Sequence, residues 1–290
     1  MQQLAQQLAN GLVVGGIYSL AALGLTLIYG IMDIVNIAHG ELFMLGALLT
    51  YYFTASFGIP FIAAVALSLV VVALLGMVIE RTALRPIANS PMVVTTLATL
   101  GVSLIVQNVT LILSGGVPRF IPSPFPETPL TIGGVDLAPA RVFAAVVAFT
   151  VILGVHFFLR KTKVGNAMRA AFQDKEASWL VGINVKTTYL LSYAFGAALA
   201  ALGGALLGVV AYVDPLMGAK GLMKCFVVVT IGGMGSFVGA IFGGLFLGVA
   251  ETLTAGYISS LWKDAIGFVL VILVLLFLPS GLFGRRARRA

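Results

Sequence analysis

The densest group of side chains that could do chemistry is Asp33, Asn36, His39 and Glu41, which follow a long apolar run. Ionisable groups beside or inside long apolar segments are costly, so they are candidates for a functional site. Two interpretations stay open at this point. The group could form the lip of a pathway, or a broken helix whose end faces a substrate. It could equally be a helix cap in an interfacial turn. Helical spacing would put Asn36 and His39 on one face, with Glu41 turned away.

Enzyme chemistry is poorly supported by the rest of the chain. There is no G-x-x-x-x-G-K-[ST] phosphate loop, no nucleophile elbow and no constellation of paired carboxylates. His39 and His156 are too few and too far apart to suggest a metal site. The single cysteine, Cys225, excludes an internal disulfide framework. We therefore expect no catalytic residue, no metal and no cofactor, and transport is the better hypothesis.

Two further features could contribute to a translocation path. Gln107 and Asn108 lie in the middle of an apolar run, where an interhelical hydrogen bond is favoured over lining the path. A glycine-rich interruption at residues 232–236 would break a helix, and non-helical backbone at membrane depth is tolerated only when it is buried or lines a cavity. Glu251 and Asp214 are expected at membrane interfaces instead. The path candidates are Asn36, His39, Glu41, Gln107, Asn108, Gly232, Gly233, Gly235 and Ser236.

The elements that must position these groups are transmembrane helices. Hydrophobic residues make up 60% of the 290 positions, charged residues only 9%, and mean hydropathy is +1.10. Soluble domains carry about 25% charged residues. The apolar runs are continuous rather than alternating, which favours helices over a β-barrel. We expect an all-α polytopic membrane protein with about 8 transmembrane or half-membrane helices, including broken or re-entrant segments. The runs cover residues 8–31, 37–53, 60–81, 92–113, 141–159, 188–210, 223–250 and 265–278.

The distribution of charge predicts an orientation. Basic residues gather at positions 81–85, 160–186 and 285–289, and each cluster abuts an apolar run, as cytoplasmic loops do. This pattern argues against nucleic acid as the partner of the +7 net charge. It places the N-terminus outside and the C-terminus in the cytoplasm. The run at residues 223–250 must then contribute an even number of crossings, as a re-entrant hairpin or as two short helices. The first residues lack the basic region of a cleavable signal peptide.

Two loops differ from the apolar remainder. Residues 114–139 are rich in proline and glycine and are expected outside the apolar core. Residues 160–186 form the longest cytoplasmic stretch and contain a helix-like block at 167–181, ended by Gly182. The block combines small and apolar residues (Ala170, Ala171, Ala177, Leu180 and Val181) with charged ones (Asp174, Lys175 and Glu176). It is either a solvated loop or a helix that docks on a cytoplasmic partner.

Five blocks in order carry a resemblance to a known family. They are VNIAHGE at 35–41 within residues 29–47, LRP at 84–86 with LGVS and QN at 100–108, residues 165–184, GGMGS at 232–236 and PSGLFG at 279–284. The chain resembles the permease subunits of ABC importers for branched-chain amino acids, nearly from end to end. Lys220 and Lys224 depart from this pattern, because a more neutral sequence is expected there. They could reflect contact with an anionic substrate or a lipid.

The resemblance implies a single transmembrane permease domain over residues 1–290, in a bacterial cytoplasmic (inner) membrane. It also implies partners: two ATP-binding subunits, a second related permease subunit in a heterodimer or homodimer, an extracytoplasmic solute-binding protein and membrane lipids. The loop at 160–186 would be the coupling element that docks on an ATP-binding subunit. Its coupling residues would be Arg169, Ala170, Asp174, Glu176, Ala177, Leu180 and Gly182.

The substrate and the energy source stay open at this point. Branched-chain or other aliphatic amino acids are the first expectation from the resemblance, although relatives also import urea, short amides and aromatic carboxylates. The alternative class is a secondary transporter driven by an ion gradient. In that case Asp33, Glu41 or Glu251 would be the coupling carboxylate.

Overall fold

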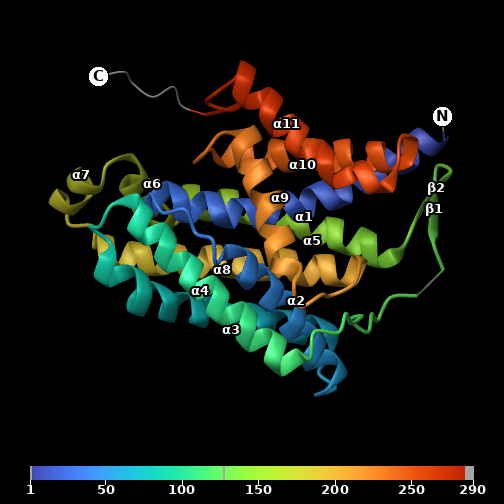
Figure 1. The fold of residues 1–290 in the computed structure, drawn as a ribbon, viewed down its shortest axis with the longest axis horizontal. Helices are drawn as coiled ribbons and strands as arrows, with labels where there is room; N and C mark the ends of the chain where they lie inside the picture. The colour runs from blue at the N-terminus through green and yellow to red at the C-terminus, as the bar shows by residue number, and fades with distance from the viewer. Residues whose placement is uncertain (1, 127, 285–290) are drawn as a thin grey trace.

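The structure, a computed structural model, describes residues 2–126 and 128–284, and most of these residues are helical (Figure 1). The long elements are α1 (Gln2–Met32), α2 (His39–Ala55), α3 (Phe61–Ile79), α4 (Met92–Ser114), α5 (Pro139–Lys161), α8 (Val185–Val210), α9 (Met217–Gly232), α10 (Phe237–Tyr257) and α11 (Lys263–Phe277). The short ones are α6 (Lys163–Gln173), α7 (Lys175–Leu180), β1 (Leu130–Ile132) and β2 (Val135–Leu137). A π-helical turn (Glu80–Leu84) and two 3₁₀ turns (Arg85–Ile87 and Ser260–Trp262) complete the chain.

Seven of the described helices are long and apolar enough to cross a membrane. Five of them are α1, α4, α5, α8 and α10; the sixth is α3 with the turns that follow it, and the seventh is α11 with the turn that precedes it. The remaining apolar helices, α2 and α9, have 17 and 16 residues. The expected class, an all-α polytopic membrane protein with full and shorter apolar helices, is confirmed.

The centre of the bundle is α1, which packs against α8 and α10 on different sides (Figure 1). In its most apolar window 83% of residues are buried, whereas the corresponding value for α11 is 6%. Small residues permit this close packing, since apolar side chains alone do not drive helices together in lipid. A side chain on Gly196 of α8 would lie 2.8 Å from the carbonyl oxygen of Gly24 in α1. Glycine is therefore required where α1 and α8 cross.

The predicted break after the first span lies at residues 33–38. Asp33 has a φ of 54°, in the left-handed region that aspartate tolerates better than most residues. The chain then turns back, and α2 begins beside the middle of α1, where His39 Nε2 lies 2.9 Å from the carbonyl oxygen of Ala21. α2 therefore starts inside the bundle and, with 17 residues, is shorter than the helices that are long enough to span a membrane.

The ambiguous run at residues 223–250 is built as two antiparallel helices, α9 and α10, which are joined at Gly233–Ser236. The backbones approach closely, because a side chain on Gly243 would lie 2.6 Å from the carbonyl oxygen of Val228. The structure therefore has a pair of helices here, and α10 is the one long enough to span a membrane.

The bundle has two distinct ends (Figure 1). The hairpin of β1 and β2 lies beside the start of α1, where Gln2 Nε2 donates to the carbonyl oxygen of Gly134 at 2.9 Å. We call this the hairpin end. The opposite end carries α6 and α7, and we call it the α7 end. The proline- and glycine-rich loop and the basic loop thus lie at opposite ends of the molecule.

Candidate functional site

The segment at the α7 end is two helices, not the single helix-like block expected at 167–181. Thr162 caps α6, because its hydroxyl accepts from the amide of Gly165 at 3.0 Å. Asp174 then leaves the helical conformation with φ −159° and ψ 113°, and its carboxylate accepts from the amide of Ala177 at 2.9 Å. This N-cap interaction starts α7 as a new helix. The prediction missed the break because aspartate is also found on the surface of continuous helices.

The end of α7 presents three consecutive exposed apolar side chains: Trp179, Leu180 and Val181. Gly182 terminates the helix with φ 85°, and Ile183 folds back to donate to the carbonyl oxygen of Ser178 at 3.0 Å. Exposed tryptophan and leucine in one patch are typical of a surface that a partner covers. The exposed patch therefore favours docking over a solvated loop.

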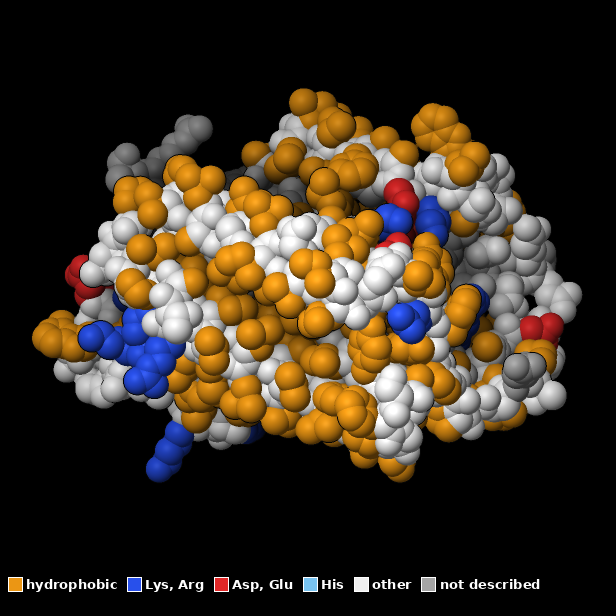
Figure 2. Space-filling model, turned by 60° about the horizontal axis from the view of Figure 1, so that its bottom comes forward, with side chains coloured by type: hydrophobic (Ala, Val, Ile, Leu, Met, Phe, Trp, Pro, Cys, Tyr) orange, Lys and Arg blue, Asp and Glu red, His pale blue; other side chains and the backbone are white. Residues whose placement is uncertain are grey.

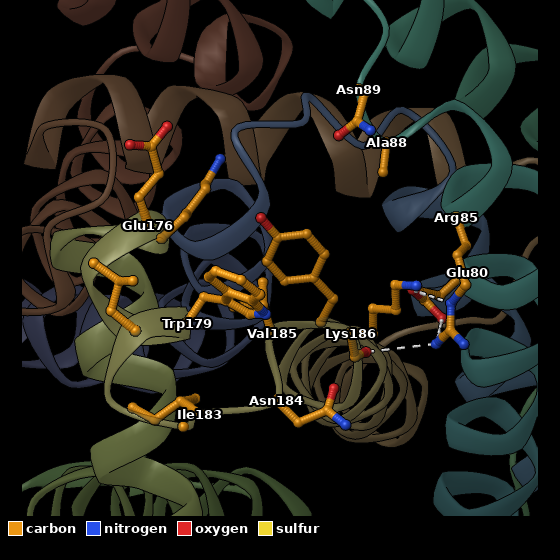
Figure 3. Close-up of a pocket in the computed structure, with 14 residues that line it drawn as sticks. Glu80, Arg85, Ala88, Asn89, Glu176, Trp179, Ile183, Asn184, Val185 and Lys186 are labelled. Carbon is orange, nitrogen blue, oxygen red and sulfur yellow. Dashed lines mark hydrogen bonds and ion pairs between the residues drawn. The ribbon is translucent and has the colours of Figure 1, made fainter.

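A cavity of about 1030 Å³ lies beside this patch, between α7, the start of α8 and the segment that follows α3 (Figure 3). Figure 3 shows Glu176 and Trp179 on one side and Arg85 with Asn89 on the other. Arg85 is held in place by Glu80, to which its Nη2 and Nε donate at 2.7 and 3.2 Å. Because Glu80 is buried, this ion pair fixes one wall of the cavity. A preformed hollow with an apolar rim can receive a protruding element of another subunit.

An ion pair joins α7 to the break between α1 and α2. Lys175 Nζ lies 2.7 Å from the Oδ2 of Asp33, although the two residues are 142 positions apart. Burial alone would lower the pKa of Lys175, but the hydrogen bond to Asp33 and the neighbouring Tyr189 outweigh it and raise the pKa. Lys175 is therefore cationic at neutral pH, and its ion pair links α7 to the start of the broken segment.

Beyond the break, Asn36, His39 and Glu41 are all buried inside the bundle. His39 faces α1, whereas Glu41 faces α4, where the hydroxyl of Ser103 donates to its Oε1 at 3.3 Å. Glu41 is thus turned away from His39 as expected, but Asn36 precedes α2 and shares no helical face with either. Both polar atoms of the Asn36 amide, His39 Nδ1 and Glu41 Oε2 have no hydrogen-bond partner among the described residues. Such unsatisfied buried groups are costly, so the cluster stays a candidate for a functional site.

Sequence comparison places the chain among known proteins. A family model described as "Branched-chain amino acid transport system / permease component" matches residues 7–275. The chain belongs to this permease family. It is 36% identical to the high-affinity branched-chain amino acid transport system permease protein BraD of Pseudomonas aeruginosa, over 97% of this chain and 95% of that protein. It is 35% identical to the corresponding protein LivH of Escherichia coli K12, over the same shares of the two chains.

The fold of the permease also has a counterpart among solved structures. The structure of PsaBC from Streptococcus pneumoniae in complex with Fab contains a chain that aligns with a TM-score of 0.53. The alignment covers 93% of this chain and 91% of that chain at 11% identity, so it supports the arrangement of the helices only. The family, and not this structural likeness, shows that the protein is a membrane transport subunit and not an enzyme.

The other predicted path residues of the permease lie apart from the buried cluster. Asn108 is exposed on α4, where its Nδ2 donates to the carbonyl oxygen of Leu104 in its own helix. Gln107 beside it is only partly buried. The structure therefore brings neither residue to Asn36, His39 and Glu41.

The glycine-rich turn at 232–236 lies at the α7 end and packs against residues 279–284. The amides of Leu282 and Phe283 donate to the carbonyl oxygens of Ile231 and Gly232, each at 2.9 Å. A side chain on Gly235 would lie 3.2 Å from the ring of Phe172 in α6. The turn thus lies near α6, and it contains the predicted path residues Gly232, Gly233, Gly235 and Ser236. The two glycine-containing motifs of the sequence form one packed unit there.

One ionisable cluster of the permease was not predicted. Lys224 of α9 forms ion pairs with Glu251 of α10 and with Asp264 of α11, the latter at 2.7 Å. Glu251 is buried rather than interfacial, and its Oε2 also accepts from the hydroxyl of Tyr18 at 3.1 Å. The sequence carried one signal for this cluster, namely a lysine placed in an apolar run that is elsewhere neutral. The partners could not be found because they lie on two other helices.

Proposed function

We propose that this permease is the membrane subunit of an ATP-driven importer for branched-chain amino acids. The proposed partners are two ATP-binding subunits, a second related permease subunit and an extracytoplasmic solute-binding protein. The names of the relatives BraD and LivH support the substrate class. The observation that carries the ATP-driven part is the exposed apolar end of α7 beside a preformed cavity. This surface is suited to a protein partner on one side of the membrane.

The proposed coupling route starts at α7 and ends in the bundle. Docked on an ATP-binding subunit, α7 moves with it when ATP closes the two subunits. The ion pair between Lys175 and Asp33 passes this movement to residues 33–38, a non-helical segment whose Val35 carbonyl and Ile37 amide are bonded to the Thr99 hydroxyl of α4. The displaced segment carries Asn36 and the start of α2, so the buried cluster with His39 and Glu41 opens or closes. Elements with few internal hydrogen bonds absorb such changes at low cost.

The proposed orientation has the α7 end in the cytoplasm and the hairpin end outside. Basic side chains gather at the α7 end, on the left of Figure 2. They include Arg81, Arg85, Arg160, Lys161, Lys163, Arg169, Lys175 and Lys186. An excess of lysine and arginine next to spans is typical of cytoplasmic loops. In a bacterial cell this orientation would place the permease in the cytoplasmic membrane, with the N-terminus outside and the C-terminus inside.

The energy source is tested by reconstitution. The permease is placed in proteoliposomes with its ATP-binding subunits, the second permease and the binding protein, and uptake of labelled leucine, isoleucine and valine is measured with and without ATP. We expect uptake only with ATP and all partners. Uptake by the permease alone under a proton or sodium gradient would instead indicate a secondary transporter. Asp33, Glu41 and Glu251 would then be the coupling carboxylates to replace. Urea, acetamide and benzoate serve as competitors that test the substrate class.

A further inference from the structure

A second cavity, of about 570 Å³, lies between α1, α9 and α11, nearer the hairpin end than the α7 end. Small-molecule sites have volumes of about 300–1,000 Å³ and are mostly apolar with a few placed polar groups. This cavity has that character. Its apolar wall is formed by residues that include Phe43, Leu207, Met223, Val227 and Phe268. Its polar wall is formed by Tyr18, Asp214, Lys220, Lys224, Lys263 and Asp264.

The ionisable groups of the polar wall are unevenly paired. Lys224 forms ion pairs with both Glu251 and Asp264, so two carboxylates share one ammonium group. Lys220 and Lys263 line the same cavity, are exposed, and have no ion-pair partner among the described residues. Figure 2 shows acidic and basic side chains together in a recess flanked by apolar ones, on the half of the molecule away from α7. The cavity therefore offers two cations without an ion-pair partner among the described residues, and a carboxylate, Asp264, that shares Lys224 with Glu251.

The cavity also adjoins the buried cluster. The first turns of α9 lie between the cavity and the buried cluster, and glycines in these turns let both approach the α9 backbone closely. A side chain on Gly218 would lie 2.6 Å from the Oε2 of Glu41, and one on Gly221 would lie 2.8 Å from the ring of Phe43, which itself lines the cavity. A small molecule in the cavity thus lies about one helix turn away from the Glu41 carboxyl group, whose Oε2 has no hydrogen-bond partner among the described residues.

We propose that this cavity is a binding site for a zwitterionic aliphatic amino acid on its way into the permease. The α-carboxylate binds Lys220 and Lys263, the α-ammonium binds the carboxylate of Asp264, and the aliphatic side chain lies against the apolar wall at Phe43 and Val227. The choice of amino acid rests on the proposed function. A ligand with only one charge would lose one of these two charge-assisted contacts.

Binding of labelled leucine to the full-length chain in phosphatidylcholine nanodiscs tests this site. Two analogues compete: isocaproate, which lacks the ammonium, and isopentylamine, which lacks the carboxylate. We expect both to compete at least about 10-fold more weakly than unlabelled leucine, since each loses a charge-assisted contact. Replacing both exposed lysines (K220Q with K263Q) should weaken leucine binding by a similar factor, and so should Asp264→Asn. The matched control, K161Q with K163Q, changes the net charge equally at the opposite end and should bind leucine normally.

Three results would overturn the site. The first is unchanged leucine binding in the K220Q/K263Q variant. The second is competition by isocaproate as strong as that by leucine. The third is that leucine does not bind, while the unaltered chain retains phosphatidylglycerol and the K220Q/K263Q variant does not. That result would assign the cavity to a lipid headgroup. The proposed function is tested separately, by ATP-driven uptake in the complete transporter. Normal uptake without binding here would overturn only the site, and leucine binding without ATP-driven uptake would overturn only the importer.

Discussion

Replacing Trp179 by alanine should weaken docking of the ATP-binding subunit without unfolding the permease. The side chain is 70% exposed at the end of α7, so few contacts within the chain are lost. A tryptophan buries about 200 Å² when fully covered, and 70% of that is about 140 Å². At about 25 cal/mol per Å² this area corresponds to about 3.5 kcal/mol as an upper bound. Ordering of side chains at the interface costs part of this energy. We therefore expect the substitution to weaken binding of the subunit by about 2 kcal/mol, which is about 30-fold in Kd.

The measurement is the affinity of purified ATP-binding subunit for the permease in nanodiscs, with uptake per hydrolysed ATP as a second readout. Trp262 supplies a matched control, because it is 63% exposed but lies in the turn between α10 and α11, near the hairpin end. Trp262→Ala should leave the affinity for the ATP-binding subunit unchanged. Docking through Trp179 is refuted if Trp179→Ala binds the subunit as tightly as the unaltered chain does. It is also refuted if Trp262→Ala weakens this docking as much.

Three further predictions concern coupling and packing. Asp33→Asn and Lys175→Gln should each lower uptake per ATP by up to about 5-fold, and the double variant should lose no more than either single variant. Additive losses in the double variant would exclude a direct interaction between Asp33 and Lys175. Gly182→Val places a β-branched residue at φ 85° and should uncouple ATP hydrolysis from uptake, and coupled uptake at the normal rate would show that the end of α7 is not needed. Gly204→Ala should lower the free energy of unfolding in detergent by about 2 kcal/mol, since its side chain would collide with the backbone of α2, while Gly101→Ala in open space should not.

The sequence was most informative where structure depends on local composition. The apolar runs located the spans within a few residues, because a helix in lipid must satisfy its backbone within the segment. The break after α1 was also predictable, since Asp33 and Asn36 interrupt the apolar pattern. The split at Asp174 was missed, because aspartate is found both on helix surfaces and at helix N-caps. Its role as an N-cap depends on the extended backbone at this residue, which the sequence does not show.

The candidate site was predicted in part. Asn36, His39 and Glu41 were chosen from their polarity, and the structure places all three in one buried region. Gln107 was chosen for the same reason, yet it lies apart from them. Polarity identifies residues that are costly in an apolar run, but it does not identify the face of a helix that neighbours will cover.

By itself, the sequence determined the membrane class, the approximate bounds of most apolar helices, the break after the first span and the basic loop. All of these depend on neighbours within about 20 residues along the chain, which is the length of one span. Only the tertiary structure decided the long-range pairs. Lys175 meets Asp33 across 142 positions, and Lys224 meets Asp264 across 40. The physical reason is that each pair depends on how separate helices pack and turn, and close packing through small residues leaves no signal in the spacing of the charges themselves.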